Sequence, residues 1–283
     1  YLRISGKDHP AYAKSLNDLA TLYRNQGRYE EAESLFQKAL EICRRVLGKD
    51  HPDFTTSLSN LANLYRCQGR FEEAERLYQQ VLEIQRHLIG KELPDYYGGN
   101  LINLARLKIG HGRYEEAEAH IQQALEVTRR MLGEEHPDCA STLNSLALFY
   151  RTQGRYEEAE PLFQQTLEIR RQALGEEHPD FASSVNNLAL LYMKQERYEE
   201  AEPLYQQALE ILRRVLGEEH PEFATTVHNI GELRENQSRE EEAFQLYQQA
   251  AEIYARTLGN EHPRTKIAIR NCQRLEQKLN RES

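Results

Sequence analysis

Apolar residues recur along the chain in two stripes with helical spacing. The first stripe falls at Leu16, Leu19, Ala20, Leu22 and Tyr23. The second falls at Tyr29, Ala32, Phe36, Ala39 and Leu40. Within each stripe the residues lie mostly three or four positions apart, which places them on one face of a helix. The pattern predicts a pair of helices, here called helix A and helix B.

The ends of both helices are marked by residues that favour helix termini. Pro10 suits the first turn of helix A, and Gly27 suits the left-handed conformation that follows a helix. Helix B is expected to end near Leu47 and Gly48. Because the connections have only a few residues, consecutive helices are predicted to pack antiparallel.

The pattern repeats every 42 residues, once 43, as the prolines show. They stand at positions 10, 52, 94, 137, 179, 221 and 263. A fixed period of this size indicates stacked two-helix units that bury their apolar faces against one another. The predicted units cover residues 10–51, 52–93, 94–136, 137–178, 179–220 and 221–262, followed by a capping helix over 263–281. No linker-like segment interrupts them, so one domain over 1–283 is expected.

The first ten residues, "YLRISGKDHP", resemble the later "CRRVLGKDHP". The sequence is therefore expected to begin inside a repeat and to be a piece of a longer protein.

The segment "LNDLATLYRNQGRYEEAESLFQKALEI" resembles a tetratricopeptide repeat. The 42-residue form, with "LGxxHP" between units, is similar to the repeats of kinesin light chains and their bacterial relatives. The resemblance covers all six units. It implies an all-α fold, an α-solenoid of antiparallel helix pairs that consists of six tetratricopeptide repeats and a C-terminal capping helix and forms a right-handed superhelix.

Two units depart from this pattern. The third opens with "YYGG" and has Lys108 where other units have tyrosine. Its glycines are interpreted as a hinge or as sequence drift, with a binding specialisation as the alternative. The sixth has Gly231, Arg234 and Ser238 in place of alanine, tyrosine and glycine.

Charge and composition exclude several kinds of partner. The net charge of -9, with no basic stripe, argues against nucleic acid. The apolar runs are too short to span a membrane. The four cysteines share no CxxC or Cys/His ligand pattern, which favours a reduced, cytoplasmic location.

The repeated "GRYEEAE" raises the question of acid–base chemistry. Glu30 and Glu31 diverge on a helix, so they cannot converge on one substrate atom. They suit the positive end of helix B instead. The His-Pro histidines, one per unit, cannot surround one metal ion and are interpreted as helix-entry residues. We predict no catalytic residue, no metal and no cofactor, and therefore no enzyme.

The outward face of helix A is mostly small and amide-bearing, whereas that of helix B is charged. Helix A lines the concave groove in tetratricopeptide arrays, so the resemblance places these residues in a peptide-binding groove. Amides suit a peptide backbone because they both donate and accept hydrogen bonds. The candidate residues are Lys14, Asn17, Arg24, Asn60, Asn63, Arg66, Asn103, Arg106, Asn144, Arg151, Asn187, Lys194 and Asn229. Apolar contacts are expected from Leu148, Leu190 and Met193.

In kinesin light chains, asparagines of this kind and nearby basic residues contact acidic cargo peptides. The matching positions are Asn60, Asn103, Asn187 and Asn229, with Asp18 and Ser145 as departures. The alternative interpretation is that the amides hydrogen-bond neighbouring helices; both roles are compatible.

The predicted function is a non-catalytic protein–protein interaction module that binds an extended peptide segment, acidic ones included, in a kinesin light chain-like adaptor role. It is expected to be a monomer or a weak homo-oligomer. The alternative is a structural or regulatory arm that spaces, oligomerises or restrains an effector domain of a larger signalling protein.

Overall fold

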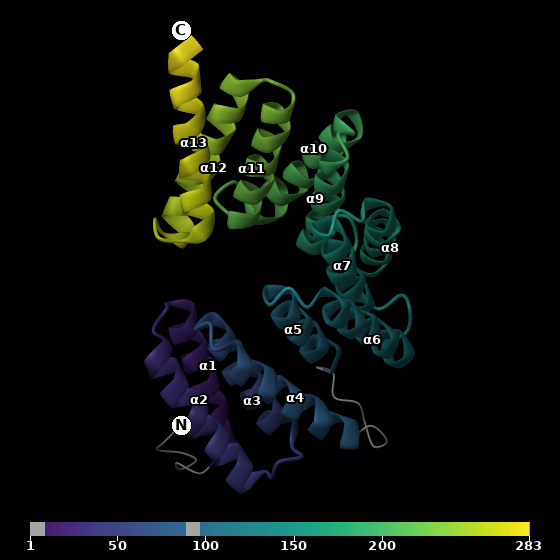
Figure 1. Ribbon diagram of the computed structural model, residues 1–283, viewed down its shortest axis with the longest axis vertical. Coiled ribbons are helices and arrows are strands. Elements are labelled where there is room, and N and C mark those ends of the chain that lie inside the picture. Colours follow the sequence, from purple (N-terminus) through teal and green to yellow (C-terminus); the bar gives the residue numbers. More distant parts are fainter. Residues whose placement is uncertain (1–8, 89–96, 283) are drawn as a thin grey trace. The chain divides into compact units, whose positions relative to one another are not determined.

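A computed structural model describes residues 9–88 and 97–282, and throughout these ranges the regular structure is α-helical (Figure 1). Helix A of the six repeats is α1 (Pro10–Asn25), α3 (Pro52–Cys67), α5 (Tyr97–Gly110), α7 (Pro137–Thr152), α9 (Pro179–Lys194) and α11 (Pro221–Asn236). Helix B is α2 (Tyr29–Val46), α4 (Phe71–Leu88), α6 (Tyr114–Leu132), α8 (Tyr156–Leu174), α10 (Tyr198–Leu216) and α12 (Glu240–Leu258). The last helix is α13 (Pro263–Glu282). The all-α solenoid of helix pairs is confirmed.

The predicted helix ends are confirmed as well. His51 Nδ1 accepts the backbone N–H of Asp53 over 3.1 Å, and the other His-Pro histidines of the described residues cap their helices in the same way. Gly27 has φ +77° after α1, a conformation that favours glycine. The expected start of the third repeat at Pro94 and the stub before Pro10 lie mostly outside the described residues.

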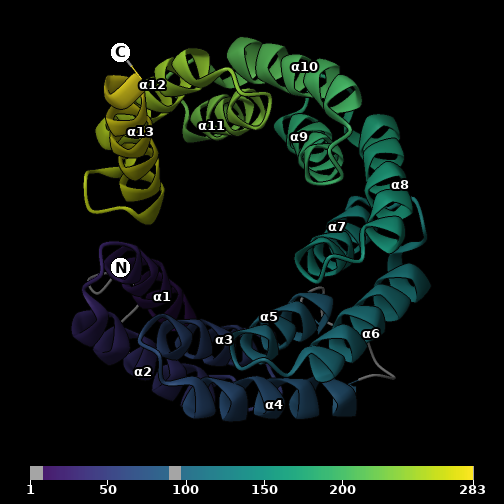
Figure 2. The same cartoon turned by 45° about the horizontal axis from the view of Figure 1, so that its top comes forward.

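The chain divides into two compact units, residues 1–133 with α1 to α6 and residues 134–283 with α7 to α13. Within each unit the A helices form one layer and the B helices a second (Figure 2). Each A helix packs against helix B of its own repeat, and α3, α5, α9, α11 and α13 also pack against the preceding helix B. The single domain over 1–283 stays a prediction.

Small and large side chains alternate at the contact between the two helices of a repeat. One alanine near the start of each helix B is fully buried: Ala32, Ala74, Ala117, Ala159, Ala201 and Ala243. One turn later a large side chain is buried, for example Phe36 and Tyr205. The alanine lets the helices approach closely, and the aromatic ring fills the wider space beside it.

Two of the unusual glycines have packing reasons. A Cβ at Gly98 would lie 2.9 Å from Thr128 Oγ1, and one at Gly231 would lie 3.0 Å from the ring of Tyr247. Both distances are shorter than normal contact. Glycine therefore lets α5 approach α6 and lets Tyr247 sit against α11, while Gly99 has open space around its Cβ position.

The apolar stripe of the first helix A is less covered than predicted. Leu19 and Leu22 were expected to be packed, but Leu22 is 51% exposed, whereas the equivalent Leu64 of α3 is 0% exposed. The difference arises because α3 has the preceding α2 to pack against, and no earlier helix is present among the described residues.

Candidate peptide-binding face

Amide side chains join neighbouring A helices in the second compact unit. Asn187 Nδ2 donates to Asn144 Oδ1 over 3.0 Å. One repeat later, Asn229 Nδ2 donates to Asn186 Oδ1 over 3.1 Å. On α13, Asn271 Nδ2 lies 3.1 Å from His228 Nε2. We call the outward side chains of the A helices the helix-A row. The role predicted as an alternative, bonding between helices, is confirmed for these asparagines.

The first compact unit does not repeat this pairing. Asn17 Nδ2 donates to Ser57 Oγ over 2.9 Å, and Asn63 Oδ1 accepts from Tyr78 over 2.8 Å. Asn60 and Asn103 are half-buried and have no side-chain hydrogen bond within the described part of the chain. Their amide groups are therefore available to a ligand.

Three of the candidate residues contain a buried polar atom without a hydrogen-bond partner. Of the five such atoms among residues 9–88 and 97–282, three are Asn17 Oδ1, Arg66 Nε and Arg151 Nη1. Arg66 and Arg151 occupy the same position of helix A, one in each compact unit. Burial lowers the pKa of Arg151, which shows that its guanidinium is poorly solvated. An unsatisfied buried N–H costs about 1–3 kcal/mol, so both arginines are held in place at some cost to stability.

Three of the other basic candidates, Lys14, Arg106 and Lys194, are exposed. Arg24 is half-buried and donates to Asn25 Oδ1 over 3.3 Å. Lys194 Nζ pairs with Glu232 on α11 over 2.6 Å. This row therefore presents both positive charge and an acid.

One expected apolar contact is wrong. Met193 is only 1% exposed, and its sulfur accepts from the hydroxyl of Tyr205 over 3.9 Å. It fills the space between α9 and α10 instead of facing a ligand. Asn229 is the most buried candidate asparagine, at 9% exposed, and donates to Asn186; its place in a peptide groove stays a prediction. Leu148 and Leu190 are partly exposed, as a binding role requires.

A second polar arrangement, which we call the repeat clasp, was not foreseen. Glu33 of α2 accepts from the hydroxyl of Tyr65 over 3.0 Å and from Arg70 over 2.9 Å. Glu160 of α8 accepts in the same way from Tyr192 over 3.0 Å and from Arg197 over 2.8 Å. The glutamate belongs to helix B of one repeat, and its donors belong to the next. The recurrence of these residues with the 42-residue period was a signal that could have revealed it.

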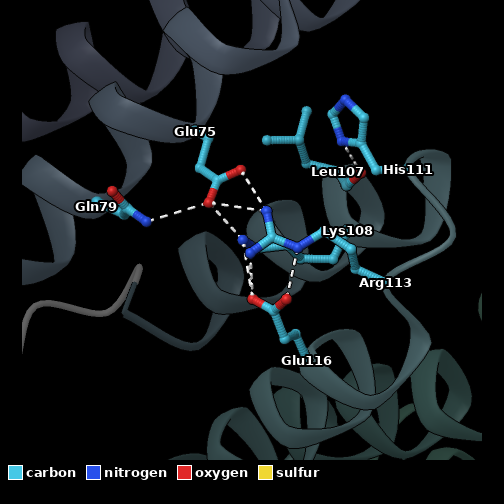
Figure 3. Close-up of polar contacts among 7 residues, drawn as sticks. All are labelled: Glu75, Gln79, Leu107, Lys108, His111, Arg113 and Glu116. Carbon is cyan, nitrogen blue, oxygen red and sulfur yellow. Dashed lines mark hydrogen bonds and ion pairs between the residues drawn. The ribbon is translucent and has the colours of Figure 1, made fainter.

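In the third repeat, Lys108 takes the place of the clasp tyrosine (Figure 3). Its side chain is 2% exposed, and Nζ contacts Glu75 of α4 and, over 3.1 Å, Glu116 of α6. Arg113 pairs with both carboxylates, at 3.2 Å to Glu75 and 2.5 Å to Glu116. The clasp is thus converted into an ionic cluster around a buried lysine, which joins the second and third repeats.

The acid cluster of helix B has the predicted position. Glu30 and Glu31 lie in the first turn of α2, and Arg28 pairs with Glu31. Within the described ranges, no group of three or more histidine, cysteine, aspartate or glutamate side chains is placed to hold a metal ion. Across the same residues, no helix combines the length and apolar character needed to cross a bilayer.

The stacked helix pairs define an α-solenoid repeat protein. The tetratricopeptide repeat model matches residues 12–87, 99–172, 139–184 and 180–254, so the chain belongs to the tetratricopeptide repeat family. No curated protein matches the sequence at a significant level.

Solved structures of kinesin light chain type are similar to this chain. BtubC (BKLC) from P. vanneervenii is 27% identical with a TM-score of 0.70, over 83% of this chain and 94% of that one. The nearly identical TPR-like repeats of a kinesin light chain from Podospora anserina are 29% identical with a TM-score of 0.59, over 73% and 97%. PilF of Pseudomonas aeruginosa, 19% identical with a TM-score of 0.56 over 93% and 97%, shares the fold. The chain is thus a kinesin light chain-like tetratricopeptide array, and its fold is that of a protein-binding scaffold. Arrays of this family are in general non-catalytic interaction modules.

Proposed function

We propose that the helix-A row binds an extended, acidic peptide segment of a partner protein. The observation that carries this proposal is the pair of equivalent, half-buried arginines, Arg66 and Arg151, neither of which forms an ion pair among the described residues. A guanidinium in this state binds a carboxylate more strongly than a solvated one does, because less water must be removed from it.

The neighbouring residues supply the other contacts that such a segment needs. Around Arg66, the uncommitted amides of Asn60 and Asn103 can each donate to and accept from a peptide backbone. In the unit of Arg151, the partly exposed Leu148 and Leu190 offer apolar contact, and Lys194 offers a second positive charge that Glu232 partly neutralises. Each compact unit therefore contains its own set of polar and charged contacts.

The similarity to kinesin light chains supports an adaptor role, in which the peptide belongs to a cargo or a regulator. We also propose that the chain works in the cytoplasm, as a monomer or a weak homo-oligomer and without nucleic acid.

The proposal is tested by selecting peptides from a displayed random library against the whole chain. We expect enriched acidic sequences with a Kd near 1 μM, about -8 kcal/mol. Replacing Arg66 and Arg151 together by glutamine is expected to weaken binding about 10-fold to 100-fold, because the charge-assisted hydrogen bond is then lost in whichever unit holds the peptide.

Arg171→Gln is the matched control. Arg171 is also an arginine of the second unit, but it is exposed and already paired with Glu168 and Glu176 at 3.0 Å. Unchanged affinity in the Arg66/Arg151 double variant would show that peptides bind elsewhere.

A further inference from the structure

One arginine of the second compact unit is buried without a counter-ion. Arg170 of α8 is 8% exposed, and no carboxylate of residues 9–88 and 97–282 forms an ion pair with it. Its Nη1 donates to the backbone carbonyl of Asp180 and to Ser184 Oγ, both over 2.8 Å. Burial lowers the pKa of Arg170, and the charge of Asp180 offsets this only in part. A buried charge without an ionic partner is costly, so this arginine needs a reason.

Packing between repeats does not supply that reason. The equivalent residues of the other B helices are all neutral: Cys43, Gln85, Thr128, Leu212 and Tyr254. Two of them reach the next helix A at the same place as Arg170. Cys43 Sγ lies 3.8 Å from Ser57 Oγ, and Gln85 accepts from Asn100 over 3.3 Å. A neutral side chain is therefore sufficient for this contact, and the positive charge belongs to the fourth repeat alone.

The outer end of the Arg170 guanidinium lies at the helix-A row. Helix α8 belongs to the layer of B helices, and α7 and α9 belong to the layer of A helices (Figure 2). Nη2 of Arg170 is 3.5 Å from the Oγ of Ser141, an exposed residue of α7, which is long for a hydrogen bond. Tyr254, at the equivalent position of α12, likewise donates to Thr225 of α11 over 2.9 Å. A large side chain at this position thus extends from helix B to the row.

Arg170 and Arg151 therefore place positive charge near two points of the same helix. Ser141, which marks the end of Arg170, is ten residues from Arg151 on α7, a separation of about 15 Å along the helix axis. The partly exposed Leu148 lies between them. An extended peptide rises about 3.3 Å per residue, so about four of its residues cover this distance. Its side chains at i, i+2 and i+4 point to one side.

We propose that Arg170 binds a second carboxylate of the peptide on the helix-A row, four residues from the carboxylate bound by Arg151. The ligand is then an extended segment with acidic residues at i and i+4 and an apolar residue at i+2. The second acid gives Arg170 the anionic partner that the described part of the chain does not supply, and the apolar side chain contacts Leu148. This inference rests on the proposed function and adds to it the spacing of the acids.

The probe is a blocked, fluorescently labelled peptide that contains glutamate, serine, leucine, serine and glutamate in this order between flanking glycines. Its affinity for the whole chain is measured by fluorescence anisotropy. Two further peptides of the same composition place the glutamates two or seven positions apart. We expect the i, i+4 peptide to bind at least 5-fold more tightly than either of them.

Arg170→Gln is expected to weaken binding of the i, i+4 peptide about 5-fold to 10-fold, because a charge-assisted hydrogen bond is lost. The fold tolerates glutamine at this position, since Gln85 occupies it in the second repeat. Arg171→Gln is the matched control and is expected to leave the affinity unchanged, because Arg171 is exposed and paired with Glu168 and Glu176. Thermal unfolding checks that both variants remain folded.

A double-mutant cycle separates direct contact from an effect on the fold. Each glutamate of the probe is replaced by glutamine in turn. One of these replacements is expected to weaken binding to the wild-type chain but not to the Arg170→Gln chain, where its contact is already missing. If both replacements weaken binding to the two chains equally, Arg170 does not touch the peptide and the inference is wrong.

Three other results would also overturn it: no binding of the i, i+4 peptide to the wild-type chain, equal affinity for the three spacings, or unchanged affinity of Arg170→Gln. None of these would decide the proposed function, which is judged by the peptides that the random library yields and by the Arg66/Arg151 double variant.

Discussion

The hydroxyl of Tyr192 donates to Glu160 over 3.0 Å and so joins α9 to helix B of the preceding repeat. Tyr65 and Glu33 make the same bond over the same distance in the other compact unit. Because its members lie 32 residues apart in the sequence, this bond forms only when two repeats stack.

Tyr192→Phe is predicted to lower the free energy of unfolding by about 0.5–1.5 kcal/mol, since one hydrogen bond to a carboxylate is lost while Arg197 still neutralises Glu160. Urea denaturation followed by circular dichroism measures the change. Tyr198→Phe is the control, because Tyr198 is a half-buried tyrosine of the next helix without a clasp partner. Equal losses in both variants would contradict a specific role for the clasp.

Lys108→Met is predicted to destabilise the chain by about 2 kcal/mol. The substitution leaves Glu75 and Glu116 with only Arg113 to neutralise them. Breaking a fully buried ion pair costs about 3–5 kcal/mol. The expected cost here is smaller because Glu116 is half-exposed. Lys108→Tyr introduces the residue of the other clasps and is expected to recover part of this loss by donating to Glu75. A Lys108→Tyr chain less stable than Lys108→Met in urea would be inconsistent with the clasp.

Gly231→Ala is predicted to cost about 1–3 kcal/mol, because the new Cβ would lie 3.0 Å from the buried ring of Tyr247 and force it to move. Gly99→Ala is the matched control, since it lies in α5 with open space around the new atom. There the loss of backbone freedom in the unfolded chain predicts a gain of up to about 1 kcal/mol. The two thermal midpoints are expected to shift in opposite directions.

The docking of α13 is predicted to weaken in acid. The pKa of Glu235 is lowered, chiefly by the hydrogen bonds from Arg274 and also by the one from Tyr247. Because the folded pKa lies below the ordinary value of about 4.3, this stabilisation is present above that value and is lost as the pH falls through the lowered pKa.

Glu235→Gln is therefore expected to cost about 1 kcal/mol at pH 7 and much less at pH 3. Glu241→Gln, an exposed glutamate of α12, serves as the control. A cost of Glu235→Gln that is the same at both pH values, measured by thermal unfolding, would rule out the ionic contribution.

Much of this fold follows from local sequence. The proline and histidine that begin most A helices, the glycine that follows most of them and the spacing of apolar residues act within a few positions of one another. They predicted the helices, the capping and the period. The alanine and aromatic positions predicted the packing between the two helices of one repeat. A short turn joins these helices, so their apolar faces must meet.

The tertiary structure decided what lies between repeats. The sequence does not distinguish whether Asn187 and Asn144 bind a ligand or each other. Only the packing of α9 beside α7 brings their side chains within 3.0 Å. Lys108 is buried because Glu75 and Glu116 converge on it from two helices, which composition does not reveal. Leu22 has the residue type of Leu64 but not its neighbour. The sequence by itself thus determined each helical unit through short-range capping and periodicity, whereas burial, pairing and exposure depended on contacts about 40 residues apart that only packing creates.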